Sequence, residues 1–178
     1  SKILRHKAVA EGFEIDNDGY ISIDELLKSN KFKSLKTTKQ DIFEIVASDD
    51  KSRFQLNSLK DKIRAVQGHS IKILDESKIL TKINPVNLHI LPNYNANKYF
   101  MIHGTSERNY KSIIESGYLK KMDRTHVHFT FKVPENNDVV VSGYRNSSQV
   151  LIFIDIHKLI ADDRFKDGVF LSKNNVIL

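Results

Sequence analysis

The stretch Ile63-Arg64-Ala65-Val66-Gln67-Gly68-His69-Ser70 decides how the first half of the chain is interpreted. Residues 62–66 predict a strand, and residues 53–56, on the other side of a turn, predict its partner. Because side chains alternate along a strand, Arg64 shares a face with Val66. A half-buried arginine requires an anionic partner, which is either a structural carboxylate of the chain or a bound anion.

The residues upstream of this ribbon predict helices. Residues 1–11 have a helical pattern, and Asn17-Asp18-Gly19 predicts a turn. Ser22 and Glu25 fit a capping box at the start of a second helix, and a third helix begins near Thr38. Helices followed by a two-stranded ribbon are the pattern of a winged-helix domain, which we expect to occupy residues 1–83.

Downstream of the ribbon, the composition changes. Residues 81–98 contain five asparagines and two of the three prolines of the chain, Pro85 and Pro92, which predicts a linker or an irregular crossover at 84–98. A second lobe, 99–178, contains a helix that Ser106 caps and a short helix at 157–161. Tyr110, Ile113 and Ile114 are expected to face inward. Short apolar runs predict strands at 99–103, 127–131, 139–141, 150–156, 168–171 and 175–178. Strands with few helices predict an α+β fold.

Composition narrows the function. The 178 residues include 28 basic and 22 acidic ones, a net charge of +6 that favours an anionic partner such as nucleic acid. The sequence has no run of 18 apolar residues, so it predicts no transmembrane helix. It also has no phosphate-binding loop, dinucleotide-binding glycine motif or serine-nucleophile motif. The absence of cysteine fits an intracellular protein. Because the chain begins at Ser1, we expect its natural N-terminus to lie upstream.

Three further strings combine basic and small residues. Arg5-His6 lies in the first expected helix, and a solvated helix face is the usual interpretation of such a pair. His103-Gly104-Thr105 follows an apolar run and precedes a helix, where glycine allows close approach of a ligand and the helix N-terminus favours an anion. In Arg124-Thr125-His126-Val127-His128 the two histidines share a strand face, but without a third ligand we expect no metal.

Taken in order, Arg5-His6, the segment 64–70, His103-Gly104-Thr105 and the segment 124–128 resemble the tRNA 2′-phosphotransferase family. The resemblance implies an N-terminal winged-helix lobe that binds RNA and a C-terminal ADP-ribosyltransferase-like lobe, with a mostly antiparallel split sheet, that binds NAD. It also implies the reaction. The internal 2′-phosphate of a ligated tRNA is transferred to NAD through an ADP-ribosylated RNA phosphate, giving a 2′-hydroxyl, nicotinamide and ADP-ribose 1″,2″-cyclic phosphate.

The resemblance also suggests roles for residues. Phosphate binding and catalysis are expected of Arg5, His6, Arg64 and Arg124, and the ribose and nicotinamide of NAD are expected near His103, Gly104 and Thr105. Asn109 is expected near the adenosine of NAD and Arg145 near its pyrophosphate, although an exposed loop arginine is as good an interpretation. Many protein-modifying ADP-ribosyltransferases use a late glutamate, and here Val176 is expected at that position.

Other partners follow from charge. Five lysines without an intervening acid, together with His69, are candidate RNA contacts, although a solvated loop is the commoner fate of such lysines. They are Lys28, Lys31, Lys33, Lys36 and Lys39. We expect a monomer in the cytoplasm, the nucleus or both. Two alternatives are an ADP-ribosyltransferase that acts on another acceptor, such as a nucleic-acid terminal phosphate, and a non-catalytic RNA-binding module.

Overall fold

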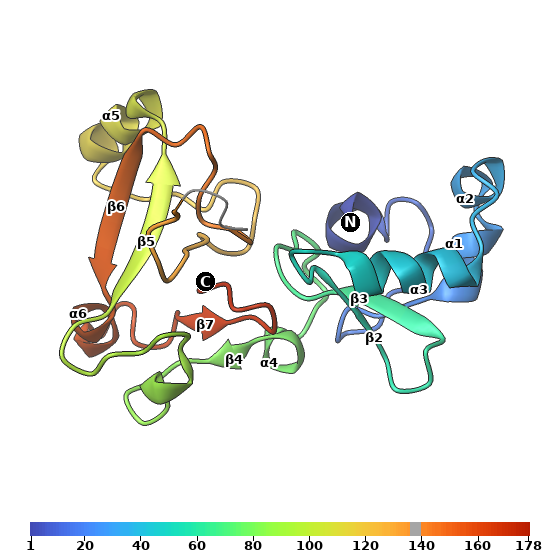
Figure 1. Ribbon diagram of the computed structural model, residues 1–178, viewed down its shortest axis with the longest axis horizontal. Coiled ribbons are helices and arrows are strands. Elements are labelled where there is room, and N and C mark those ends of the chain that lie inside the picture. The colour runs from blue at the N-terminus through green and yellow to red at the C-terminus, as the bar shows by residue number, and fades with distance from the viewer. Residues whose placement is uncertain (136–139) are drawn as a thin grey trace. The chain divides into compact units, whose positions relative to one another are not determined.

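The computed structural model describes residues 1–135 and 140–178 (Figure 1). Within these ranges the chain divides into two compact units, Ser1–Ile79 and Leu80–Leu178, which we call unit 1 and unit 2. Both mix helices with small antiparallel sheets. The α+β class expected from the sequence is therefore confirmed. Among the described residues, no helix has the length and apolar character needed to cross a bilayer.

Unit 1 is built from short helices around a three-stranded antiparallel sheet. The strand order is β1-β3-β2, so that β3, which carries Arg64, is central. Ile21 pairs with Ile63 on one side of β3, and Gln55 pairs with Arg64 on the other. The elements in chain order are η1 (Ile3–Lys7), β1 (Ile21–Ser22), α1 (Ile23–Lys28), α2 (Asn30–Ser34), α3 (Lys39–Ser48), β2 (Phe54–Leu56), β3 (Lys62–Ala65) and α4 (Glu76–Ile79).

Local signals place the helices of unit 1. The Ser22 side chain accepts a hydrogen bond from the Glu25 N–H at the start of α1, and Thr38 and Asp41 form a reciprocal capping box at the start of α3. Both helix starts agree with the sequence. The segment of five lysines was expected to be a loop, yet it contains α2, which is anchored by the partly buried Phe32.

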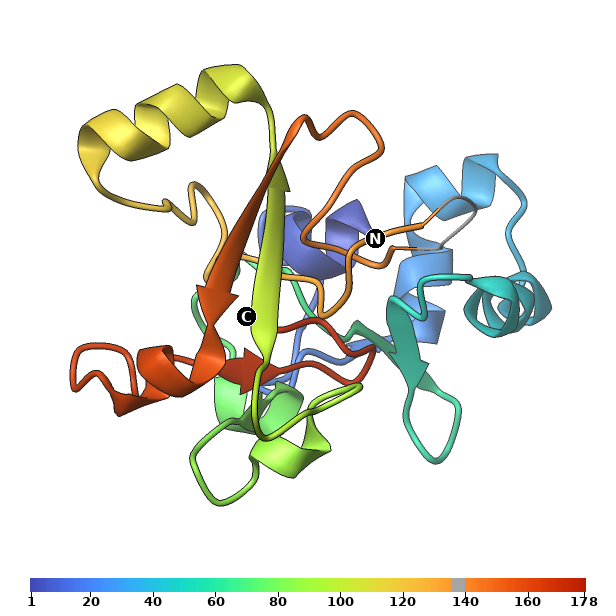
Figure 2. The ribbon, with the colours of Figure 1, turned by 60° about the vertical axis from the view of Figure 1, so that its left-hand side comes forward.

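Unit 2 contains two antiparallel ribbons. In the longer one, β5 (Phe100–Thr105) pairs with β6 (Val150–Asp155) along its full length, and the two strands lie side by side in Figures 1 and 2. In the shorter one, β4 (Thr81–Lys82) pairs with β7 (Phe170–Leu171). The remaining elements are η2 (Leu88–Ile90), α5 (Glu107–Ser116) and α6 (Ile156–Ala161).

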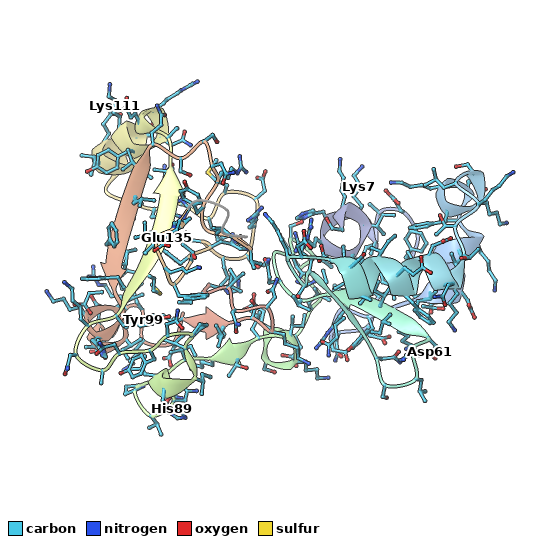
Figure 3. The ribbon with its side chains drawn as sticks, viewed as in Figure 1. Lys7, Asp61, His89, Tyr99, Lys111 and Glu135 are labelled. Carbon is cyan, nitrogen blue, oxygen red and sulfur yellow. The ribbon has the colours of Figure 1, made fainter. Side chains whose placement is uncertain are left out.

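Residues 84–98 are packed into unit 2. Leu88 and Leu91 are buried in its core, together with Met101 and Ile156. The Tyr99 hydroxyl, labelled in Figure 3, donates a hydrogen bond to the Pro92 carbonyl at 2.8 Å, and burial raises the pKa of this phenol. The segment expected as a linker therefore supplies core residues as well as turns.

Three expectations about unit 2 need correction or restriction. Residues 127–131 and 175–178, both expected to be strands, form no continuous strand; their bridges are isolated and join Ile102 to Thr130, Phe129 to Ile177 and Leu171 to Ile177. The expected strand at 139–141 lies partly outside the described residues, and its described part is not a strand. Tyr110 and Ile114 are exposed rather than inward, because α5 lies at one end of the β5–β6 ribbon (Figure 2) and buries no residue.

Candidate functional site

The Arg-His segment of unit 1 is held against the turn that follows β3. Ile3 and Leu4 are buried in the core of unit 1 and anchor η1, whereas Lys7 projects into solvent (Figure 3). The Ser70 N–H donates to the Arg5 carbonyl at 2.9 Å, and Ser70 Oγ lies 3.0 Å from His6 Nδ1. Two hydrogen bonds thus fix consecutive residues of η1 to one residue of the turn.

Arg64 lies on the central strand, and its side chain is surrounded by neutral groups. Its Nε and Nη2 atoms donate to Gln55 Oε1 at 3.0 and 2.8 Å. Its Nη1 atom donates to the carbonyls of Asp18 and Lys78 at 2.8 and 3.2 Å. The guanidinium carbon lies 4.6 Å from the centroid of the Tyr20 ring. The anionic partner expected for this buried arginine is therefore replaced by an amide, two carbonyls and an aromatic ring.

The lowered pKa of His69 reflects both its burial and the positive charges around it. The residue is only 6% exposed, and its pKa is lowered to about 4, mainly by burial and then by the positive charges of Arg5, His6 and Arg64. Its imidazole is neutral at pH 7 and lies within electrostatic range of all three residues. Unit 1 alone therefore brings three of the four expected phosphate-binding residues to one region.

In unit 2, His103 lies on β5 with a fixed orientation. Its Nδ1 atom donates to the His128 carbonyl at 2.9 Å, and its ring packs edge-on against Phe129 with centroids 5.9 Å apart. Because a carbonyl only accepts, Nδ1 carries the proton, and in the neutral ring Nε2 is an acceptor. Thr105, at the end of the same strand, is buried with an exposed fraction of 8%.

Gly104 allows a loop of unit 2 to pack closely on β5. A Cβ atom at Gly104 would lie 2.7 Å from Cδ2 of Tyr144 and 2.8 Å from Oγ of Ser148. The Gly104 N–H donates to the Gly143 carbonyl at 2.7 Å, and Gly143 itself adopts a φ of +82°. The sequence suggested that a ligand could approach Gly104 closely. In the structure, Tyr144 and Ser148 of this loop occupy the space beside its Cα atom.

The remaining expected residues of unit 2 are exposed. Arg124 lies in a turn in which the Lys121 ammonium donates to the Arg124 carbonyl at 2.8 Å. Asn109 lies on the first turn of α5, where its N–H donates to Ser106 Oγ. Arg145 lies in a turn closed by a hydrogen bond from the Ser148 N–H to its carbonyl.

Unit 2 also contains a small cavity of about 150 Å³. Its wall includes Phe129, Thr130, Ser142, Asn174 and Val176, and the Val176 side chain is almost completely buried, at 1% exposed. Val176, expected where related enzymes of other families carry a glutamate, thus adds an apolar group to a partly polar wall. Among residues 1–135 and 140–178, no cluster of three or more histidines and acids could hold a metal.

Comparison with known proteins identifies the family of the chain. The family model described as RNA 2'-phosphotransferase, Tpt1 / KptA family, matches residues 1–178. The chain belongs to this family. The tRNA 2'-phosphotransferase of Saccharomyces cerevisiae is 40% identical over 182 residues, a match that covers 100% of this chain and 74% of the yeast protein.

Two other relatives of this RNA 2'-phosphotransferase family member come from Danio rerio and from a Rhizobium. The tRNA 2'-phosphotransferase 1 of Danio rerio is 33% identical over 184 residues, covering 100% of this chain and 74% of the relative. A probable RNA 2'-phosphotransferase of Rhizobium leguminosarum bv. trifolii is 33% identical over 178 residues, covering 100% of this chain and 84% of the relative. The family resemblance and the expectation of a transferase are confirmed.

Within this family member, the structure distributes the expected residues between two sets. Unit 1 gathers Arg5, His6, Arg64 and His69 around residues 68–70. Unit 2 carries His103, Gly104, Thr105, Asn109, Arg124 and Arg145 on β5, α5 and two turns. The five candidate RNA-binding lysines lie on unit 1 and are all exposed.

Sequence reasoning missed the groups that hold Arg64 and those that cover Gly104. Tyr20 directly follows the turn at Asn17-Asp18-Gly19, and Gln55 lies opposite Arg64 in the strand register. The pairing of residues 53–56 with 62–66 was predicted without a register, so Gln55 was not identified as the neighbour of Arg64. No local pattern indicates Tyr144 or Ser148, because they reach Gly104 from a loop about 40 residues away in the chain.

Proposed function

We propose that this protein transfers the internal 2′-phosphate of ligated tRNA to NAD. The products are RNA with a free 2′-hydroxyl, nicotinamide and ADP-ribose 1″,2″-cyclic phosphate. The observation that carries the proposal is the group of Arg5, His6 and Arg64 around the buried, neutral His69. A region with several cations and a neutral imidazole favours a dianionic phosphate, and the family membership supports RNA as its carrier.

The first proposed step needs little acid–base help from the protein. A phosphate monoester has a second pKa of about 6 and is mostly dianionic at pH 7, so it is already a nucleophile. A phosphate oxygen attacks the anomeric carbon of the nicotinamide ribose, and the bond to nicotinamide breaks with its electron pair. The hydrophobic Val176 at the cavity wall agrees with a step in which no glutamate is required.

The second proposed step needs charge stabilisation and a proton. The ribose 2″-hydroxyl loses its proton to solvent as its oxygen attacks the phosphorus, the bond to the RNA 2′-oxygen breaks, and that oxygen takes up a proton. We assign the proton, or a hydrogen bond to the phosphate, to His6, whose position is fixed by Ser70. Arg5, Arg64 and Arg124 are assigned to the phosphoryl oxygens, because guanidinium remains charged at any working pH.

The proposal also assigns roles to the two units. Unit 1, as a winged-helix lobe, binds RNA through exposed lysines, whereas the His69 side chain, expected as a further RNA contact, is only 6% exposed. Unit 2, as an ADP-ribosyltransferase-like lobe, binds NAD. His103, with its fixed tautomer, and the buried Thr105 are assigned to the ribose and nicotinamide side of NAD. Asn109 is assigned to adenosine and Arg145 to pyrophosphate. We propose that a single chain acts inside the cell, where tRNA is spliced.

The deciding experiment mixes the protein with NAD and an oligonucleotide that carries one internal 2′-phosphate. The expected result is equal amounts of nicotinamide, cyclic phosphate and dephosphorylated RNA, with no reaction of the matched 2′-hydroxyl oligonucleotide. Stable ADP-ribose on the RNA would instead favour transfer to another acceptor. Binding of RNA without nicotinamide release would indicate a non-catalytic module.

A further inference from the structure

The neutral surroundings of Arg64 are unusual for a buried arginine. Arg64 is 4% exposed, and the partners of its guanidinium are Gln55 Oε1, the carbonyls of Asp18 and Lys78, and the ring of Tyr20. Among the described residues, no carboxylate forms an ion pair with it. Buried charges in proteins are normally paired with an opposite charge. Here hydrogen-bond donors are satisfied while the positive charge is not cancelled.

These neutral partners fix the orientation of the Arg64 guanidinium without offsetting its positive charge. Four of the five guanidinium N–H groups have partners on three sides, so the plane of the group is fixed. A carboxylate in place of Gln55 would give the same two hydrogen bonds but would offset the charge. The uncancelled charge is felt nearby, because Arg64 is one of the groups that keep His69 neutral.

We propose that Tyr20 and Gln55 are positioning residues that hold the Arg64 guanidinium in place while leaving its positive charge available to the RNA 2′-phosphate. This inference rests on the proposed function and extends it to two residues outside the family-like strings. We call Tyr20, Gln55 and the carbonyls of Asp18 and Lys78 the neutral socket.

Tyr20 contributes through its ring face. The guanidinium carbon lies 4.6 Å from the ring centroid, within the range of a cation–π contact. The turn before Tyr20 supplies the Asp18 carbonyl to the same guanidinium, and it is closed by hydrogen bonds from Gly19 N–H to the Asp16 carbonyl and from Asp16 N–H to the Tyr20 carbonyl. One rigid turn thus delivers both a ring and an acceptor to Arg64.

The test measures binding rather than turnover, so that it is independent of NAD. The quantity is the ratio of affinities for an oligonucleotide with one internal 2′-phosphate and for its 2′-hydroxyl counterpart. We expect Tyr20→Leu to lower this ratio about tenfold, because leucine cannot make the cation–π interaction. Tyr20→Phe keeps the ring and should keep the ratio within about twofold of the wild type.

Gln55→Glu tests the charge. It keeps the size and hydrogen-bonding oxygen of Gln55 but pairs Arg64 with a carboxylate. We expect the affinity ratio to fall about tenfold or more while the melting temperature is unchanged or higher. This combination separates the proposal from a purely structural role, for which added stability would leave the ratio unaltered.

The outcomes are decisive. An unchanged ratio in Gln55→Glu, or an equal loss in Tyr20→Phe and Tyr20→Leu, overturns the neutral socket. So does a wild-type protein with no preference for the 2′-phosphate. If the wild type prefers the 2′-phosphate and the variants behave as expected, but NAD is not consumed, the proposed function fails while the neutral socket stands.

Discussion

His6 and Ser70 lie 64 residues apart in the chain and are joined by a contact of 3.0 Å between Nδ1 and Oγ. The backbone strengthens this contact, since the Ser70 N–H also donates to the Arg5 carbonyl. The orientation of the His6 ring therefore depends on a residue at the end of the segment 64–70. The two family-like strings of unit 1 act as one structural element.

Replacing Ser70 by Ala should lower turnover without unfolding the chain. The substitution removes the hydrogen bond to His6 but leaves the backbone bond to Arg5, so we expect about a two- to tenfold loss in kcat. Steady-state kinetics with NAD and 2′-phosphorylated RNA measure the loss. Ser77→Ala, which removes a hydroxyl that donates to the Asp75 carboxylate, is the matched control and should leave kcat unchanged.

Replacing Arg64 by Lys should slow the second chemical step about 100-fold or more, because lysine keeps the charge but loses the planar fork. The same change at Arg124 should act in the same direction. Single-turnover rates of cyclic phosphate release measure this step. Arg164→Lys, at a side chain that is 76% exposed, is the control. Near-native rates in either variant would contradict the assignment of that arginine to the phosphoryl oxygens.

The stability of the protein should depend on pH through His69. Its pKa is about 4 in the folded chain, against 6.5 for the free side chain. The unfolded chain therefore takes up a proton at a higher pH than the folded chain does. The free energy of unfolding should fall as pH drops from about 6.5 to about 4, by at most about 1.4 kcal/mol per pH unit. Denaturant unfolding should give a steeper dependence on pH in the wild type than in His69→Gln, because only the contribution of His69 is removed.

Replacing Gly143, Gly104 or Gly117 by Ala should destabilise the protein to different extents, with the largest loss at Gly143. Ala at Gly143 combines a φ of +82° with a Cβ only 2.5 Å from the Phe129 carbonyl carbon, and should cost about 3 kcal/mol or more. Ala at Gly104 collides with side chains, which can move, and should cost less. Ala at Gly117 meets nothing within 4 Å and pays only for its φ of +70°, about 1 kcal/mol. Thermal unfolding measures all three, and a different order would contradict the packing of this loop.

The exposed lysines of unit 1 should determine the salt dependence of RNA binding. Replacing Lys31, Lys33 and Lys36 by Gln should reduce the slope of log affinity against log salt by about 0.7 for each RNA phosphate that a lysine no longer neutralises. Replacing Lys111 and Lys158, which are exposed on unit 2, is the control for total charge. An unchanged slope would indicate that these lysines are simply solvated.

The features that the sequence predicted correctly are those determined by neighbouring residues, namely helix ends and one strand pair. Ser22, Thr38 and Ser106 each accept a hydrogen bond at the helix start expected from their side chains. The pairing of β2 with β3 followed from two short apolar runs around a turn. Gly117 ends α5 in the left-handed conformation that glycine favours.

The sequence did not predict what distant residues determine. Arg64 was expected to need an acid, because a strand pattern cannot show that a carbonyl 46 residues away and an amide on the next strand satisfy its donors. The exposure of Ile114 was missed for a similar reason, since helical periodicity shows which residues share a face but not whether the core reaches that face.

Because β3 pairs with a strand on each side, the two connections that lead to these strands should differ in how well they tolerate insertions and deletions. The connection between β2 and β3, residues 57–61, can gain or lose residues at its tip while Gln55 still faces Arg64. The connection that ends at Tyr20 has no such freedom, because one added residue there would shift the pairing of Ile21 with Ile63 or turn the aromatic ring to the opposite side of the strand. Evolutionary drift and engineered insertions should therefore accumulate in the first connection and spare the second.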